Sequence, residues 1–496
     1  MRYLPTGKQM QMADFNTINN IGIPSMVLME RAALKTVEVM EKEEIDLNNT
    51  VIFCGSGNNG GDGFAVARLL DEKGLKVTIV FVGRESSMSD GCRAQRDICV
   101  KKGIPVVTDT TRDDYTAVID AVFGVGLNRE IKGSYVEVIE KMNSMNGYKI
   151  AVDIPSGVCS STGKLLGVVF KADLTLTFQC EKVGMVMFPG KMYTGKTIVC
   201  KIGIDTSIYD DLENMCFTYD KHDIKELMPE RMPDTHKGSY GKVLMITGSK
   251  GMAGAAFLSA YSAYKCGAGL VSIYTAEENR IVLQSLLPEA IISTYTEFDK
   301  DRIKELLNWA DITCIGCGIG TSDISEAVLR EVLINNTKPI VIDADGINML
   351  KDKLDIINSK DYPVILTPHM MEMSRLTGYP VSEIKENRFE IIKELTENNN
   401  VICVLKDART VVTKHKKQYY INTSGNNSMA KGGSGDVLAG IITALLAGGA
   451  DEFTAACLGV YIHGCSGDKA RDLHGGYSVI GRELAEVVEC VLKDKE

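Results

Sequence analysis

Short apolar runs alternate with amphipathic segments along most of the chain. In the first half, the apolar runs predict strands at 51–54, 76–82, 117–121, 149–152 and 174–178. A helical pattern between them predicts helices at 25–42, 63–73, 90–102 and 135–145. Near-continuous apolar strands that alternate with helices are typical of a parallel sheet covered on both faces.

The alternation is interrupted once, near Ile204. Residues 205–236 are polar, contain Pro229 and Pro233 and show no sustained period, so we expect a linker with one short helix at 223–228. A second series then predicts the strands 243–247, 270–275, 312–315, 339–342, 363–367 and 401–405, a hairpin of 410–413 with 418–421, and helices at 437–446, 454–472 and 481–493. We therefore predict an α/β protein of two three-layer αβα sandwiches, with domains at 1–212 and 236–496 and a linker at 213–235.

Composition narrows the class of protein. A chain of 496 residues is long for one core, and its net charge of −10 argues against nucleic acid as the main partner. The N-terminus has no long apolar segment, and the stretch 437–450 is too short to span a bilayer, so we expect no signal peptide, no membrane span and a cytoplasmic location. The 14 cysteines have no regular spacing, which favours reduced thiols over a disulfide framework. Cys314 and Cys317 form a CxxC, for which a structural role is favoured over a redox or zinc role.

A glycine-rich turn follows the first predicted strand, Gly55-Ser-Gly-Asn-Asn-Gly-Gly-Asp-Gly63. It contains the GxGxxG pattern of dinucleotide-binding folds, whose glycines let backbone N–H groups approach an anion. A dehydrogenase would also have an acidic residue at the end of the next strand, where this chain has Arg84. We therefore treat an ordinary hydride-transferring dehydrogenase as a weaker alternative.

Aspartates mark the ends of later strands of the same half. Asp120 and Asp153 each follow an apolar run, and in an open parallel sheet these ends lie at the ligand-binding edge. We expect them to meet Asp62, and the oxygen-rich group to suit a hard cation. Each aspartate could instead only cap a helix or a turn. We expect the side chains of Asn58, Asn59 and Ser156 and the loop 124–130 to lie in the same crevice.

The second half carries its own glycine-rich turn, Gly432-Gly-Ser-Gly-Asp436, directly before an apolar helix. Amides at the start of a helix can hold a phosphate or a developing anion. Asp436 would stand among them, where it could take a proton from a substrate hydroxyl group. A glycine-rich helix cap without function is the alternative. For His463 and Cys465, two residues apart on a predicted helix, packing is favoured over metal binding.

The first half resembles the NAD(P)H-hydrate epimerases over about residues 1–210, through the segments 28–32, 57–63, 120–126 and 153–157. The resemblance implies a Rossmann-like domain that interconverts the R and S forms of hydrated NADH or NADPH. A positioned carboxylate would accelerate the proton transfers of this reaction, and Asp153 is our candidate for that role. The resemblance implies that K⁺ is held by Asn59, Asp120 and Ser156. It implies that the substrate is bound by Asn58, Asn59, Gly60, Gly61, Asp62, Gly124, Val125, Gly126, Leu127, Asn128, Arg129, Glu130 and Asp153.

The second half resembles the NAD(P)H-hydrate dehydratases of the ribokinase-like fold over about residues 225–496, through the segments 248–255, 316–320, 343–345, 367–372 and 406–410. The resemblance implies dehydration of the S form with ADP or ATP, with Mg²⁺ and with Asp436 as the catalytic base. It implies that the hydrated cofactor faces Ala255, Gly318, His369 and Asp436. It implies that the nucleotide faces Lys406, Asp407, Ala408, Arg409, Thr410 and Gly435. The chain departs from the family pattern at Met371, Asp407, Asn427 and Ser428, which affects the geometry of loops.

Three hypotheses follow. The first is a bifunctional repair enzyme that acts on hydrated NADH or NADPH with ADP or ATP, contacts no nucleic acid or membrane and forms a homo-oligomer. The second is a small-molecule kinase of the hydroxymethylpyrimidine or thiazole type with an accessory domain. The third is a binding module related to an mRNA-decapping scaffold, which the aspartates at positions 62, 120 and 153 and the acidic charge disfavour.

Overall fold

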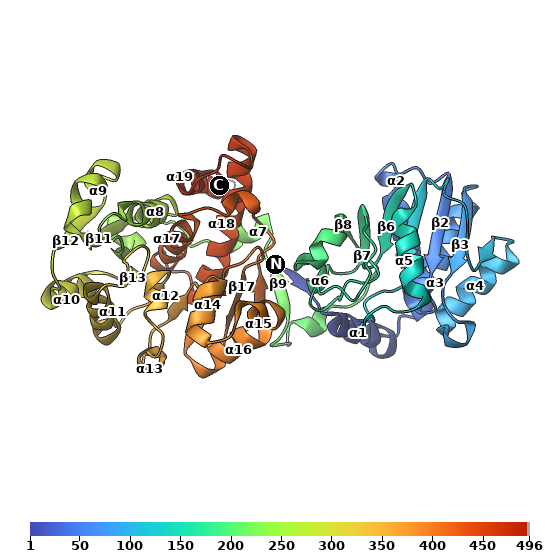
Figure 1. Cartoon of the computed structure of the whole chain (residues 1–496), viewed down its shortest axis with the longest axis horizontal. Helices are drawn as coiled ribbons and strands as arrows, with labels where there is room; N and C mark the ends of the chain where they lie inside the picture. Colours follow the sequence, from blue (N-terminus) through green and yellow to red (C-terminus); the bar gives the residue numbers. More distant parts are fainter. Residues whose placement is uncertain (494–496) are drawn as a thin grey trace. The chain divides into compact units, whose positions relative to one another are not determined.

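The computed structural model describes residues 1–493 and divides the chain into two compact units (Figure 1). One unit runs from Arg2 to Cys216, and the other begins at Phe217 and includes Met1. Each contains a largely parallel sheet with helices on both faces, so the predicted pair of αβα sandwiches is confirmed. Among residues 1–493 there is no helix with both the length and the apolar character needed to cross a bilayer.

The N-terminal unit contains a seven-stranded parallel sheet in the order β4-β3-β2-β5-β6-β7-β8. Its strands are β2 (Asn49–Cys54), β3 (Lys76–Phe81), β4 (Val106–Val107), β5 (Ala117–Ala121), β6 (Tyr148–Val152), β7 (Leu174–Phe178) and β8 (Lys196–Cys200), and β1 (Arg2–Leu4) precedes them. Its helices are α1 (Gly7–Asn16), α2 (Ser25–Lys42), α3 (Asn58–Glu72), α4 (Asp90–Lys101), α5 (Ser134–Ser144) and α6 (Val183–Val186).

The strand order of this sheet changes direction between β2 and β5: β3 and β4 follow on one side of β2, and β5 to β8 follow on the other. Because the strands are parallel, their carboxyl ends and the loops that follow β2, β5, β6 and β7 share one edge. Alternate strand residues face opposite layers: Ile52 and Ile119 pack with α2 and α3, whereas Val51 and Val118 pack with α5. The two apolar layers hold the strands in register and thereby bring the loops at this edge together.

The sheet of the C-terminal unit runs in the order β9-β18-β17-β16-β15-β14-β13-β10-β11-β12, parallel from β16 to β12, with the antiparallel hairpin β17–β18 beside it. The strands are β9 (Cys216–Thr218), β10 (Lys242–Ile246), β11 (Leu270–Ala276), β12 (Ile291–Tyr295), β13 (Ile312–Ile315), β14 (Ile340–Ile342), β15 (Val364–Leu366), β16 (Val401–Leu405), β17 (Val411–Lys414) and β18 (Tyr419–Ile421).

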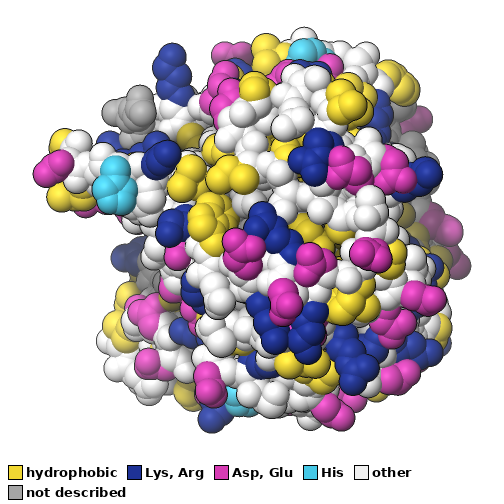
Figure 2. Space-filling model, turned by 90° about the vertical axis from the view of Figure 1, so that its left-hand side faces the viewer, with side chains coloured by type: hydrophobic (Ala, Val, Ile, Leu, Met, Phe, Trp, Pro, Cys, Tyr) yellow, Lys and Arg dark blue, Asp and Glu magenta, His cyan; other side chains and the backbone are white. Residues whose placement is uncertain are grey.

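Helices cover both faces of this second sheet (Figure 1). Those of one layer are α8 (Ala253–Lys265), α9 (Arg280–Leu286), α17 (Ser434–Ala447) and α18 (Glu452–His474), with α7 (Lys221–Leu227), α19 (Gly481–Glu486) and α20 (Val488–Lys493) packed against them. Those of the other layer are α10 (Lys300–Trp309), α11 (Asp323–Asn335), α12 (Asp345–Asn348), α13 (Leu354–Asn358), α14 (Met370–Thr377), α15 (Val381–Glu386) and α16 (Arg388–Asn398). On the face that Figure 2 shows, basic and acidic side chains are interspersed.

The predicted strands of both halves and the hairpin are confirmed, but several other elements differ from the prediction. The prediction missed α1, the short strands β1 and β4, the edge strands β8 and β12, and the helices from α8 to α16. It also missed β9, which lies with α7 inside the segment predicted as a linker. The helix predicted to begin at Gly63 begins at Asn58, because the glycine-rich segment forms its first turn. The single helix predicted at 481–493 is wrong: α19 ends at Glu486, and α20 begins at Val488.

Candidate active sites

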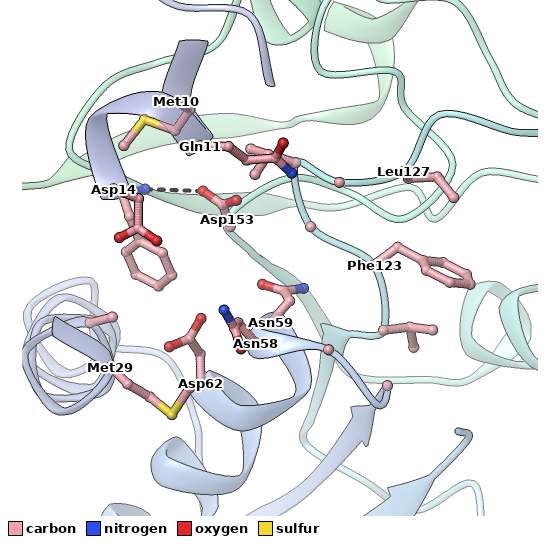
Figure 3. Close-up of a pocket in the computed structure, with 18 of the residues that line it drawn as sticks. Met10, Gln11, Asp14, Met29, Asn58, Asn59, Asp62, Phe123, Leu127 and Asp153 are labelled. Carbon is pink, nitrogen blue, oxygen red and sulfur yellow. Dashed lines mark hydrogen bonds between the residues drawn. The ribbon is translucent and has the colours of Figure 1, made fainter. Parts of the chain in front are cut away.

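A cavity of about 550 Å³ lies at the carboxyl edge of the N-terminal sheet. Its walls come from α1, α2, the start of α3 and the loops after β5, β6 and β7. Figure 3 shows Asn58, Asn59 and Asp62 on one side, and Gln11 and Asp153 on the other. The loop predicted to bind the substrate also contributes, since the residues from Gly124 to Arg129 line the cavity. Glu130, the last residue of that predicted set, is exposed and is not among the lining residues.

The first turn of α3 needs its glycines because the backbone of another segment lies against it. A β-carbon on Gly60 would lie 1.9 Å from the carbonyl oxygen of Gly55, closer than any side chain allows. A β-carbon on Gly61 would meet the side chain of Met29 from α2. Gly60 and Gly61 are therefore buried spacers. They let the side chains of Asn58, Asn59 and Asp62 reach the cavity wall.

Asp153 follows β6 and forms a buried ion pair with Lys182. The Nζ atom of Lys182 lies 2.5 Å from Oδ1 of Asp153 and also donates to Oγ1 of Thr177 at 2.7 Å and to the carbonyl oxygen of Phe178 at 3.0 Å. Lys182 is fully buried, and Asp153 is 8% exposed and lines the cavity. The backbone of Asp153 has a φ of 69°, a conformation that is rare outside glycine and costs about 1–3 kcal/mol. The fold therefore holds this carboxylate in one orientation.

Asp120, Ser156 and Asn59, the predicted K⁺ ligands, lie where β5, β6 and α3 meet. Asp120 is fully buried; Oδ2 accepts from the backbone N–H of Ser156 at 2.7 Å, and Oδ1 from its hydroxyl group at 2.7 Å. Burial raises the pKa of Asp120 to about 6, although these hydrogen bonds lower it. The side-chain Oδ1 and Nδ2 of Asn59 are buried and have no hydrogen-bond partner among the described residues. A β-carbon on Gly124 would lie 3.2 Å from Cβ of Asn59, so the predicted substrate loop passes beside this group.

In the C-terminal unit, a buried network joins the ends of β14, β15 and β16. Asp343 is 1% exposed, and its Oδ1 accepts from Nζ of Lys406 at 2.6 Å and from Oγ1 of Thr367 at 2.6 Å. Nζ of Lys406 also lies 3.8 Å from Oε2 of Glu372. Burial lowers the pKa of Lys406, but the charges of Asp343 and Glu372 outweigh it and raise the pKa overall. Burial raises the pKa of Glu372, with a further rise from Asp343 and an opposing effect of Lys406.

Asp436 lies in the first turn of α17, beside this network. Gly433 caps the helix with a φ of 91°, and a β-carbon there would lie 2.5 Å from Cδ1 of Leu258. Burial, and then the charge of Asp343, raise the pKa of Asp436 to about 7, against the lowering effects of Cys317 and Lys406. Ligand atoms of Cys317, Asp343 and Asp436 lie within 4.8 Å of one another. Cys317, expected to be structural, thus lies beside the predicted catalytic base.

The residues predicted to face the hydrated cofactor with Asp436 lie at the start of α8, in the segment after β13 and at the start of α14. Ala255 is near the start of α8, and a β-carbon on Gly318 would lie 2.7 Å from its Cβ, so Ala255 and Gly318 are adjacent. His369 is the N-cap of α14, where Nδ1 accepts from the backbone N–H of Met371 at 3.0 Å and Nε2 lies 3.2 Å from Oε1 of Glu372. Its backbone is bridged to Lys406, which connects it to the Asp343 network.

The residues predicted to face the nucleotide divide into two groups. Lys406 and Gly435 lie close together, since a β-carbon on Gly435 would be 3.4 Å from Nζ of Lys406. Asp407 instead forms an ion pair with Arg388 at 3.2 Å, and the backbone carbonyl of Asp407 accepts from Oγ1 of Thr410 at 3.3 Å. Ala408 and Arg409 follow in the same segment, where the guanidinium group of Arg409 donates to the carbonyl oxygen of Ala408 at 3.2 Å. Ser434 of the glycine turn is 3.2 Å from Nε2 of His463, whose burial lowers its pKa to about 4.

Sequence reasoning missed several residues that the fold brings to these sites. Asp14 and Gln11 come from α1, which has a short and weakly amphipathic sequence. Lys182 follows a strand end, and the same strand-end argument that selected Asp153 could have found it. Asp343, Glu372 and Cys317 stand in segments that carried the family resemblance, but a sequence does not show which side chains contact each other.

Models of two protein families match the chain. Residues 25–184 match the family described as YjeF-related protein N-terminus, and residues 243–489 match NAD(P)H-hydrate dehydratase. The bifunctional NAD(P)H-hydrate repair enzyme Nnr of Moorella thermoacetica is 34% identical and covers 100% of this chain and 97% of its own length. The corresponding enzyme of Escherichia coli K12 is 32% identical over 95% of this chain and 90% of its own length.

Solved structures are similar to the C-terminal unit. The ADP/ATP-dependent NAD(P)H-hydrate dehydratase of Bacillus subtilis, co-crystallized with ATP/Mg²⁺, is 30% identical with a TM-score of 0.51 and covers 56% of this chain and 98% of its own. A ribokinase-like superfamily protein of Enterococcus faecalis is 27% identical with a TM-score of 0.51 and covers 56% of this chain and 96% of its own. The predicted ribokinase-like fold and the predicted family are therefore confirmed. The chain belongs to the bifunctional NAD(P)H-hydrate repair enzymes.

Proposed function

We propose that the N-terminal cavity is the site at which the R and S forms of hydrated NADH or NADPH interconvert. The Asp153–Lys182 ion pair on its wall is the observation that carries this assignment. The hydrate is a hemiaminal, whose carbon can lose and regain a hydroxyl group because the lone pair of the ring nitrogen stabilises the flattened intermediate. Asp153 would accept the proton of the water that returns, and Lys182 holds its carboxylate in place. The segments 58–62 and 124–130 would bind the nucleotide around this carboxylate.

We also propose that Asn59, Asp120 and Ser156 hold K⁺. The fit is supported by the buried carboxyl group of Asp120, which has no cationic partner among the described residues, and by the buried amide of Asn59, which has no hydrogen-bond partner among them. Carboxylate, amide and hydroxyl oxygens are the donors that a hard cation takes. When bound, K⁺ would neutralise the buried charge and order the loop that begins at Val122. Ser156 already connects this loop to Asp120, because its hydroxyl group accepts from the backbone N–H of Phe123 at 2.9 Å.

For the C-terminal unit, we propose that Asp436 is the base of an ADP- or ATP-dependent dehydration of the S form. Asp436 would take the proton of the substrate hydroxyl group as its oxygen attacks the terminal phosphate. The phosphate ester leaves more readily than hydroxide; the ring nitrogen expels it, and loss of a neighbouring C–H proton restores the dihydropyridine. The amides at the start of α17 and Lys406 would stabilise the charge on the transferred phosphate.

Two further assignments belong to the same proposal. Mg²⁺ would arrive with the nucleotide. Oδ1 of Asp343 accepts from Lys406 and Thr367, and Oδ2 lies toward Gly435, so Oδ2 is the oxygen that would bind Mg²⁺. Ala255, Gly318 and His369 would contact the hydrated cofactor, and Gly435 with residues 406–410 would contact the nucleotide. A cytoplasmic location and a homo-oligomeric state remain predictions.

One experiment tests whether the two units catalyse different reactions. The full chain is incubated with a mixture of both epimers of hydrated NADH and with ADP or ATP, and the absorbance of reduced nicotinamide is followed. Complete conversion supports two active sites, because the dehydratase consumes one epimer and the epimerase replenishes it. Conversion of only one epimer would contradict the epimerase assignment. Release of a stable phosphorylated alcohol would instead favour the kinase hypothesis.

A further inference from the structure

Helix α1 brings a third carboxyl group to the N-terminal cavity. Asp14 lines the cavity together with Asp62 from α3 and Asp153 from the turn after β6. Figure 3 shows the three side chains directed toward the same space from three different elements. Asp14 lies on a helix that precedes the sheet, so neither the strand-end pattern nor the segments of family resemblance included it.

The three carboxyl groups share one buried cation. Lys182 pairs with Asp153, whereas within residues 1–493 no hydrogen bond or ion pair engages the side chain of Asp14 or of Asp62. Burial raises the pKa of Asp14, and the charge of Asp153 raises it further. Burial raises the pKa of Asp62 well above its usual value, and Asp153 and Asp14 add to the rise. The cavity therefore presents one lysine-paired carboxylate and two carboxyl groups whose charged forms are disfavoured by burial.

The other titratable groups that line the cavity do not neutralise the negative charge of these carboxyl groups. Arg129 and Tyr135 line it, and Arg129 is exposed. The thiols of Cys54 and Cys92 lie near Asp62, and their own pKa values are raised by burial and by that carboxyl group. Asp14 is thus faced by Asp62 from α3, by Asp153 after β6 and by Lys182 after β7.

Inversion at the hemiaminal carbon needs proton transfer on both faces of the ring. The C–O bond breaks as the nitrogen lone pair forms a C=N bond, and the oxygen leaves as water with a proton from an acid. Water then adds to the opposite face, its electron pair forms the new C–O bond, and a base takes the released proton. A single fixed carboxylate, such as Asp153, cannot stand on both faces.

We propose that Asp14 is a further catalytic residue of the epimerase site and gives its proton to the departing hydroxyl group, while Asp153 takes the proton of the water that adds. This inference rests on the proposed epimerase function. After one inversion Asp14 is ionised and Asp153 is protonated. Proton exchange with solvent, or the reverse reaction, restores both groups. Asp62 lines the same cavity and is the second candidate for the acid.

The test uses the full chain and a single purified epimer of hydrated NADH without ADP or ATP, with exchange followed by chromatography. The variants are Asp14→Asn, Asp14→Glu and Asp62→Asn, with Asp97→Asn on the exposed side of α4 as a matched control. We expect Asp14→Asn to lower kcat by about 100-fold or more with a smaller change in KM, since an amide cannot donate an acidic proton. Wild-type kcat should fall as the pH rises through the raised pKa of Asp14, and this alkaline limb should be lost in Asp14→Asn and return in Asp14→Glu.

Several outcomes would overturn the inference. A change in kcat below about 3-fold, an unchanged alkaline limb, or a change in KM alone would show that Asp14 is not the acid. Loss of the limb in Asp62→Asn but not in Asp14→Asn would assign the proton to Asp62. Dehydratase activity and the far-UV spectrum serve as checks that the variant is folded. Absence of epimer exchange in the wild type is a different result, because it would overturn the proposed function itself.

Discussion

Replacing Asp436 by asparagine should remove dehydratase activity and at the same time stabilise the C-terminal unit. In the folded protein the pKa of Asp436 is raised from 3.8 to about 7, mainly by burial and then by Asp343. The protonated form therefore contributes stability that is fully present below pH 3.8 and is lost as the pH rises through about 7. Asparagine has nearly the same shape and no charge, so the variant does not undergo this loss.

The magnitude follows from the pKa values. The span from 3.8 to about 7 corresponds to about 4 kcal/mol of unfolding free energy, at about 1.4 kcal/mol for each unit. We expect the variant and the wild type to be equally stable near pH 4. The variant should be more stable by about 2 kcal/mol at pH 5.5 and by about 4 kcal/mol at pH 8. Other titrating groups are common to both proteins and cancel in the difference.

The chain provides a probe for this measurement, because its one tryptophan, Trp309, lies in α10 of the same unit. Urea unfolding followed by Trp309 fluorescence at several pH values gives the difference in unfolding free energy. Asp361→Asn, at an exposed position of the same unit, is the control and should show no pH-dependent difference. A difference that stays below about 1 kcal/mol at pH 8, or that does not change with pH, would refute the idea that Asp436 is held as a destabilised charge.

Four further predictions concern the two sites. Asp153→Asn should abolish epimer exchange while dehydration of the correct epimer continues, and Asp436→Asn should do the reverse; loss of both activities in either variant would point to a shared site or a folding defect. Lys182→Met leaves Asp153 buried without its partner and should destabilise the N-terminal unit by about 3–5 kcal/mol in urea unfolding followed by circular dichroism. The double variant with Asp153→Asn should recover part of this loss, and no recovery would mean that the two side chains are not coupled. KCl should raise the melting temperature of the wild type more than NaCl does, but not that of Asn59→Ala; an equal response of both proteins would contradict the K⁺ site. Gly60→Ala should destabilise the N-terminal unit by more than about 2 kcal/mol, because its β-carbon would lie 1.9 Å from a carbonyl oxygen, and a neutral effect would show that the turn can move.

The periodic pattern was sufficient to predict the strands that are buried on both faces. Strands such as β5 and β7 consist of apolar residues flanked by turns, and burial on both sides produces this signal. The edge strands β8 and β12 are partly exposed and alternate less clearly, so the pattern does not identify them. Asn58 and the glycines after it have low helix propensity, and the sequence alone suggested a loop. Tertiary packing against Gly55 and Met29 overrides that preference and makes this segment the first turn of α3.

The same reasoning separates the parts of the sites that could be predicted from those that could not. Asp120, Asp153 and Asp436 follow from topology, because the ends of parallel strands and the starts of the helices after them share one edge. Asp14 reaches that edge from a helix that packs across it, and Lys182 reaches Asp153 through a turn. The packing of whole layers determines which side chains contact each other. A single sequence does not show these contacts.

Both units use one arrangement to divide acid and base roles among carboxyl groups. In each, a lysine pairs with one carboxylate: the fully buried Lys182 with Asp153, and the partly buried Lys406 with Asp343. In each, burial and that same carboxylate raise the pKa of a second carboxyl group, Asp14 or Asp436, which forms no ion pair with a lysine within residues 1–493. Two carboxyl groups side by side would otherwise titrate together, and neither would be suited to transfer a proton near neutral pH. The lysine thus fixes which of the two is charged. Removing either lysine should therefore change the pH profile of the reaction in its own unit as well as the stability of that unit.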